Sequence, residues 1–340
     1  MADEFDGDVK RLRPITQDTL LKLYRAMRRI RVVEEEIAEI YAEQEMRCPV
    51  HLCIGQEAIA VGACWALRPE DYVFGGHRSH GHYLAKGGDL NGMIAELYGR
   101  ATGCAGGKGG SMHLVDLACG FMGSAPIVGS TIPIAVGAAL GSEMRGEKRV
   151  AMAFFGEGAT EEGVFAESLN FAALKRLPVV FICENNGFSV YSPLSVRQPS
   201  NRDLIGIARA HGVEAYRGDG NDVSEVCDLT EQAVQRARTG DGPTLLEFTT
   251  YRWREHCGPS FDDALAYRGE DEIREGRQRC PIARLEQHLL REKLLDESAI
   301  AAIGETLSEE AKRAIRFGKQ SPFPDESLHM CDVYALEAEG

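Results

Sequence analysis

Apolar residues recur every three or four positions near the start of the chain. Between Thr16 and Gln44 these positions are Leu20, Leu23, Met27, Ile30, Val33, Ile37 and Ile40. This spacing predicts a long amphipathic helix, with Thr16 or Asp18 as its N-cap. A second, shorter and mostly apolar helix is expected over 56–67. Residues 1–15 precede the pattern, and we expect them to form a mobile arm.

The rest of the chain alternates between short apolar segments and helical patterns. Predicted strands lie at 71–74, 149–155, 178–183, 213–217 and 244–251. Predicted helices lie at 131–144, 161–175, 203–211, 222–238, 281–293 and 297–316. Strands that are apolar on both faces and alternate with helices indicate a parallel sheet covered on both sides. We therefore expect one α/β domain over 16–340, built as a doubly wound, mostly parallel sheet, with 101–126 and 252–279 irregular.

Composition narrows the function. The 340 residues carry a formal charge of −14, and 44% of them are hydrophobic. An acidic chain is a poor ligand for nucleic acid. The polar N-terminus resembles no signal peptide, no apolar run reaches the ~20 residues of a membrane span, and none of the ten cysteines forms a C-x-x-C pair. These features favour a cytoplasmic protein without membrane association.

Polar segments follow three of the predicted strands. They are Gly156-Glu157-Gly158, Glu184-Asn185-Asn186-Gly187, and Arg252 to His256. Ligands of doubly wound sheets bind beyond the carboxyl ends of the strands, so these segments are the candidate site. Of the 37 glycines, 21 lie between Gly75 and Gly163, which agrees with a binding surface built from backbone, although a loop-rich stretch would also explain it.

Two of these segments suit a metal-bound phosphate. Glu157 offers a carboxylate oxygen between two glycines that let the backbone approach a ligand. Asn186 offers an amide oxygen, and the Phe188 carbonyl lies just beyond it. Each segment alone is also an ordinary turn, but 26 residues separate Gly158 from Asn185, which is one helix and one strand. The spacing therefore brings both turns to one edge of the sheet.

This pair of motifs resembles the thiamine diphosphate motif, and the chain from about residue 20 to Ala335 resembles the alpha subunits of 2-oxo acid dehydrogenase decarboxylase components, with those for pyruvate and acetoin nearest. The resemblance also rests on HLCIGQEA, HRSHGHYLAKG, GGKGGSMH, TYRWREH and SPFPDES, which occur in the family's order. It implies an oxidoreductase that cleaves or decarboxylates a small substrate and passes the acyl group to a lipoyl carrier. The cofactor supplies that chemistry.

The resemblance also implies roles for individual residues. Thiamine diphosphate and magnesium are the expected cofactors, with Glu157, Asn186 and the Phe188 carbonyl as metal ligands. The expected cofactor contacts are His77, Arg78, Val128, Glu157, Gly158, Ala159, Asn186, Phe188, Arg252 and His256. His256, His51 and His80 match histidines with catalytic roles, although a structural role is as plausible for His51 and His80. His82, His113 and His211 are assigned structural roles.

Half of the active site is expected in another chain. In this family the glutamate that activates the cofactor belongs to a beta subunit, so the resemblance implies an alpha2beta2 heterotetramer and a lipoyl acyltransferase as partners. The chain also departs from the family pattern. Glu157 replaces an aspartate, His77 a tyrosine and Cys257 a serine, and EHCGPSFDD differs from the usual loop.

These departures leave alternatives open. The altered loop allows a thiamine-dependent carboligase that transfers a two-carbon unit to an aldehyde or ketone without a lipoyl partner. The longer Glu157 side chain allows a cofactor-binding scaffold without catalysis. A nicotinamide enzyme is disfavoured, because no G-x-G-x-x-G follows the first strand of a βαβ unit. The identity of the substrate stays open.

Overall fold

A parallel sheet of six strands forms the centre of the molecule. The computed structural model describes residues 15–46 and 48–331. The strands are β1 (Tyr72–Gly75), β2 (Phe121–Ser124), β3 (Ala151–Gly156), β4 (Val179–Asn185), β7 (Glu214–Asp219) and β8 (Thr244–Thr249). They lie in the order β2-β1-β3-β4-β8-β7, with every neighbouring pair parallel. The predicted doubly wound α/β fold is confirmed.

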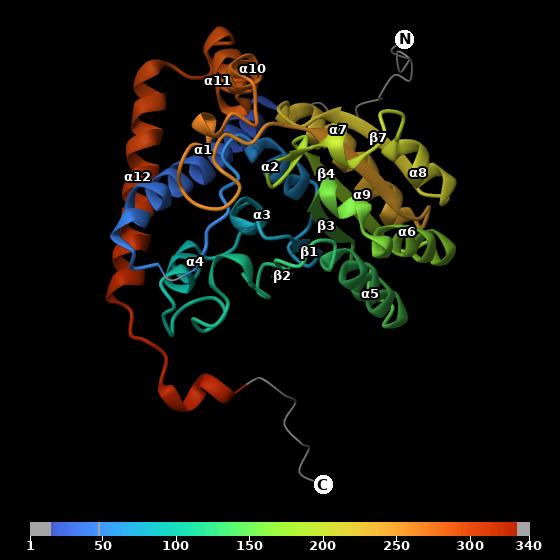
Figure 1. Cartoon of the computed structure of the whole chain (residues 1–340), viewed down its shortest axis with the longest axis horizontal. Helices are drawn as coiled ribbons and strands as arrows, with labels where there is room; N and C mark the ends of the chain where they lie inside the picture. The colour runs from blue at the N-terminus through green and yellow to red at the C-terminus, as the bar shows by residue number, and fades with distance from the viewer. Residues whose placement is uncertain (1–14, 47, 332–340) are drawn as a thin grey trace.

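Helices cover both faces of this sheet (Figure 1). Alternate strand residues face opposite ways, so the sheet separates two apolar cores. Phe154, Ile182 and Phe248 belong to the core shared with α2 (Glu57–Trp65), α3 (His80–Lys86) and α9 (Val223–Thr239). Phe155, Phe181 and Leu245 belong to the core shared with α5 (Thr131–Met144), α6 (Gly163–Lys175) and α8 (Leu204–Ala210).

A second layer of helices lies outside α2 and α3. It consists of α1 (Gln17–Ile40), α4 (Leu90–Leu97), α11 (Pro281–Arg291) and α12 (Glu297–Gln320). Figure 1 shows α12 along the left margin, where it packs across both α1 and α4. The Thr16 side chain caps α1 by accepting a hydrogen bond from the Thr19 N–H, which matches the predicted N-cap.

Several elements differ from the sequence prediction. The segment after β1 contains α3 and then α4, and neither helix is among those predicted. Residues 101–126, expected to be irregular, contain β2, and 252–279 contain α10 (Glu270–Gln278). An antiparallel pair, β5 (Phe188–Ser189) and β6 (Ser192–Pro193), precedes the short α7 (Leu194–Arg197). These elements are short, so they display too few turns or alternations to reveal a period.

Apart from Ile15, the predicted mobile arm over 1–15 lies outside the described residues. Within the described part of the chain, no helix combines the length and the apolar composition needed to cross a bilayer.

Candidate active site

A pocket opens at the carboxyl ends of β1, β3 and β4. Successive connections leave β1 and β3 toward opposite edges of the sheet, and this reversal is where doubly wound sheets bind ligands. Segments from the ends of these three strands line the pocket, together with residues before α2 and α5. The predicted site residues among its walls are His51, His77, Arg78, Val128, Glu157, Gly158, Ala159, Asn186, Phe188 and His256.

Arg78 is a buried cation without a carboxylate partner among the described residues. Its side chain donates hydrogen bonds to two backbone oxygens, that of Leu52 at 2.6 Å and that of His256 at 3.1 Å. Burial and the positive charge of Arg252 lower the pKa of Arg78 to about 10. A buried guanidinium that faces a cavity with only neutral partners fits an anionic ligand such as a diphosphate.

The predicted metal ligands Glu157, Asn186 and Phe188 line the same pocket. Glu157 begins the turn after β3, and Asn186 and Phe188 follow β4. The Asn186 Oδ1 accepts a hydrogen bond from the Phe188 N–H at 3.1 Å, which fixes the amide toward this turn. Carboxylate, amide and carbonyl oxygens are hard donors that suit magnesium. A Cβ on Gly156 would meet no atom within 4 Å, so the backbone there is open to a ligand.

Arg197 of α7 pairs with the Glu157 carboxylate. Its Nη2 lies 2.6 Å from Glu157 Oε1, and its Nη1 contacts Glu161. Burial nevertheless raises the pKa of Glu157 to about 7, although the charge of Arg197 acts in the opposite direction. A metal ion would therefore compete both with a proton and with Arg197 for this carboxylate.

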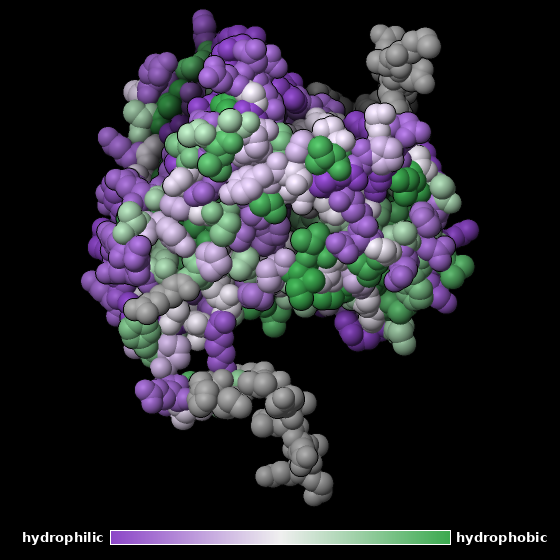
Figure 2. Space-filling view, in the orientation of Figure 1, coloured by the Kyte–Doolittle hydropathy of each residue, from purple (hydrophilic) through white to green (hydrophobic). Residues whose placement is uncertain are grey.

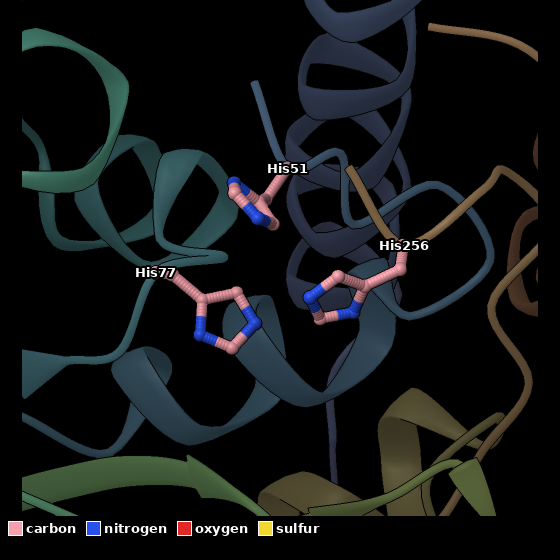
Figure 3. Close-up of side chains that lie close together, drawn as sticks. All are labelled: His51, His77 and His256. Atoms are coloured by element: carbon pink, nitrogen blue, oxygen red, sulfur yellow. The ribbon is translucent and has the colours of Figure 1, made fainter. Parts of the chain in front are cut away.

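Three histidines form one rim of the pocket (Figure 3). His51, His77 and His256 come from three separate segments, and their ring centroids lie 4.8 to 5.3 Å apart. Burial, with the charge of Arg78 as the next cause, lowers the pKa of His51 to about 3 and that of His256 to about 4. The same causes lower the pKa of His77. The imidazoles are thus neutral near pH 7 and can accept protons or hydrogen bonds.

Buried carboxylates of α1 and α2 hold the segment that carries His51. Glu34 accepts hydrogen bonds from the Cys53 N–H at 2.8 and 3.0 Å. Glu57 accepts from the Gly55 N–H at 3.1 Å and pairs with Arg31 at 2.6 Å. The long first helix therefore positions the rim of the pocket from behind.

His80 and Arg252 do not reach the pocket. His80 is buried behind it, with Nδ1 3.1 Å from Glu34 and Nε2 2.7 Å from the Ser111 hydroxyl. Arg252 is buried beside Asp262, at 3.7 Å, and its Nη2 donates to the Tyr267 hydroxyl at 3.2 Å. The structure thus gives both residues a place in packing, and neither contacts the cavity that the other predicted residues share.

Two pocket residues had no predicted site role of their own, although Glu184 belongs to one of the candidate segments. His82, assigned a structural role, and Glu184 both line the cavity, with His82 Nε2 3.1 Å from Glu184 Oε1. His82 also stacks on Phe154, and its Nδ1 is buried without a hydrogen-bond partner. The position of Glu184 at the carboxyl end of an apolar strand, directly before Asn185, was the available signal.

Comparisons with known proteins cover nearly the whole chain. The family model of the dehydrogenase E1 component matches residues 25–327. The chain is 38% identical to the alpha subunit of acetoin:2,6-dichlorophenolindophenol oxidoreductase of Bacillus subtilis, over 96% of each chain. It is 34% identical to the pyruvate dehydrogenase E1 alpha subunit of Rickettsia felis, over 96% of this chain and 98% of that one.

A third relative, the pyruvate dehydrogenase E1 alpha subunit of Rhizobium meliloti, is 37% identical over 92% of this chain and 89% of its own. None of these three relatives is named a carboligase. The matches run through the sheet, the pocket and the second helical layer, and they confirm the resemblance seen in the motifs. The chain therefore belongs to the dehydrogenase E1 component family, whose members are thiamine-diphosphate-dependent oxidoreductases.

Proposed function

We propose that the chain is the alpha subunit of a cytoplasmic dehydrogenase that acts on acetoin or a pyruvate-like 2-oxo acid and passes the acyl group to a lipoyl acyltransferase. One observation carries this proposal. A buried arginine without a carboxylate partner among the described residues lines the same pocket as three residues with hard oxygen donors, in an E1-family chain. The names of the relatives supply the two candidate substrates.

Different residues of the pocket would hold different parts of the cofactor. Arg78 and the backbone at Gly158 and Ala159 would hold the diphosphate, and Glu157, Asn186 and the Phe188 carbonyl would hold magnesium. Val128, 47% exposed at the pocket, would support the bend between the two rings. When bound, the cofactor supplies an electron sink for cleavage of the bond beside the substrate carbonyl.

The rim histidines provide acid–base groups near the reacting end. His256 and His51 are neutral near pH 7, so either ring can accept a hydrogen bond from a substrate hydroxyl group and take up and return its proton as that group reacts. His256 lies on the segment after β8, where the backbone is irregular, and the His51↔Gly258 bridge ties that segment to the one carrying His51. The bridge therefore holds the two rings in place relative to each other.

Exposed apolar residues on the pocket segment before α5, and on α5 and α6 themselves, support a beta subunit as partner. Ile127 is 72% exposed, Ile134 on α5 is 52% exposed, and Leu174 on α6 is 73% exposed. In Figure 2, apolar side chains gather over the part of the molecule where Figure 1 places α5 and α6. A contiguous apolar surface is typical of a protein interface. We propose that two beta chains cover these surfaces in an alpha2beta2 assembly.

The test is the activity of the chain co-expressed with its beta subunit. Reduction of dichlorophenolindophenol is measured with acetoin or with pyruvate, with and without thiamine diphosphate and magnesium. We expect cofactor-dependent reduction with one of these substrates, and at least about 100-fold less activity for Arg78→Gln, because a buried anion contact is lost. The absence of activity with acetoin and with every small 2-oxo acid would refute the proposal.

The carboligase alternative has a direct test. Product analysis with an aldehyde acceptor and no lipoyl protein would reveal a two-carbon transfer product. Acyl-carrier product alone would exclude that alternative, and normal turnover would exclude a scaffold without catalysis.

A further inference from the structure

The histidine rim has an arrangement that proton transfer alone does not require. One ligand nitrogen from each of His51, His77 and His256 lies within 4.8 Å of the others. Figure 3 shows the rings of His77 and His256 directed toward each other, with His51 beside the space between them. Three imidazoles directed at one point are a common ligand set of transition metals.

The backbones behind the three rings are fixed to one another. Arg78, next to His77 in the chain, donates to the carbonyl of Leu52, next to His51, and to the carbonyl of His256 itself. The Gly258 N–H donates to the Val50 carbonyl at 2.8 Å, which joins the other two segments. One guanidinium and one backbone bridge thus hold all three segments in register, so only side-chain rotation is needed to close a ligand set.

We propose that His51, His77 and His256 form a binding site for a divalent transition-metal ion of the zinc type at the rim of the pocket. Three protein nitrogens and one open position are the usual coordination of a zinc ion that also binds water or substrate. Zinc–nitrogen bonds of ~2.0–2.1 Å place tetrahedral ligands about 3.3 Å apart, so the nitrogens would move together by roughly 1.5 Å or less.

The site is distinct from the magnesium ligands. Glu157, Asn186 and Phe188 offer oxygens alone, whereas the rim offers nitrogens alone, so the two sites select different metals. The positive charge of Arg78 behind the rim opposes any cation, which sets the affinity below that of a dedicated zinc site. An ion bound there would occupy the wall that faces the substrate and would block turnover. Only this inhibition depends on the proposed function, because metal binding does not.

The test is a titration of the full chain, co-expressed with its beta subunit, with Co²⁺ in the presence of excess Mg²⁺. Magnesium fills the oxygen site, and the visible ligand-field bands of Co²⁺ report a nitrogen-bound ion. We expect one site per alpha chain, displacement of Co²⁺ by Zn²⁺, and at least about 10-fold weaker binding for His77→Gln, since loss of an outer-shell partner alone costs that much. His77 is half-buried and its ring contacts the rings of His51 and His256, so its replacement leaves the two apolar cores intact.

Control variants make the result specific. His113→Gln removes an exposed histidine whose Nδ1 lies 2.9 Å from the Gly109 carbonyl oxygen, and it should leave Co²⁺ binding unchanged. His51→Gln should weaken binding as His77→Gln does, and thermal melting checks that each variant is folded. Equal Co²⁺ affinity of the wild type and His77→Gln would overturn the proposal. A thiolate charge-transfer band would also overturn it, since it would assign the ion to a cysteine such as Cys257.

Discussion

At the scale of single residues, Glu157 would bind either a proton or the proposed magnesium ion. Burial raises its pKa to about 7, and magnesium requires the ionised carboxylate. The apparent magnesium affinity should therefore fall about tenfold for each pH unit below 7 and stay level above it. Calorimetric titration at pH 6 and pH 8, with thiamine diphosphate present, measures the difference. An affinity independent of pH would contradict this prediction.

A variant pair isolates the role of Glu157. Glu157→Gln should weaken magnesium binding by about 10- to 100-fold, because a neutral amide replaces the charged ligand. Glu161→Gln is the matched control, since Glu161 also pairs with Arg197 but does not line the pocket. Similar losses in both variants would indicate that Arg197 pairing, and not metal ligation, explains the effect.

Both the backbone conformation of Gly55 and the atoms packed around it require a glycine at this position. Its φ is +100°, and a Cβ there would lie 2.3 Å from the Tyr251 carbonyl oxygen. We expect Gly55→Ala to lower the free energy of unfolding by about 2 kcal/mol or more. Gly163→Ala is the control, because no atom lies within 4 Å of a Cβ at that position on α6. Denaturant unfolding of both variants measures the difference, and equal stability would show that the segment before α2 adapts.

At the scale of elements, the sequence predicts long elements well and short buried ones poorly. The strands at 149–155 and 178–183 carry continuous apolar runs, and the first helix repeats its apolar face over six turns, so their patterns identify them. Helix α3 is buried over His80 to Leu84, and α4 is buried nearly all round. A helix buried on every side has no amphipathic period, so α3 and α4 were not predicted, whereas the equally buried α2 was identified by its mostly apolar composition.

Site residues could be predicted where spacing along the chain determines their position, and not where contacts between distant elements do. Residues that follow strand ends, such as Glu157 and Asn186, were placed by spacing along the chain. The surroundings of His80 and Arg252 depend on Glu34 and Asp262, which come from other elements, so spacing could not place them. His82 lies on α3, and the packing of that helix against elements distant in the sequence brings its side chain to the pocket.

The exposed apolar face of α5 leads to a prediction about assembly with the beta subunit. Ile134→Lys adds a charge to an exposed apolar face, and burying that charge beside a partner is costly. We expect the fraction of chain that co-purifies with the beta subunit to fall at least about tenfold. Leu265→Lys, an equally exposed leucine at 58% on a different segment, should co-purify normally. Equal recovery of both variants would place the interface elsewhere.

At the scale of the whole molecule, the pocket, its histidine rim and the exposed apolar surface all lie at or begin beside one edge of the sheet. The ends of β1, β3 and β4 supply Arg78, Glu157 and Asn186, and the first two helices support the rim behind them. The apolar surface of α5 and α6 begins beside that same edge, so partner binding would complete the pocket wall. The chain is therefore built to work as part of an assembly.

The most direct test is the structure of the co-purified assembly crystallised with thiamine diphosphate and magnesium. We expect density for the diphosphate beside Arg78 and the Gly158 backbone. We expect the metal between Glu157, Asn186 and the Phe188 carbonyl, with Arg197 displaced from Glu157. Cofactor density elsewhere in the assembly, or a metal without these ligands, would contradict this expectation.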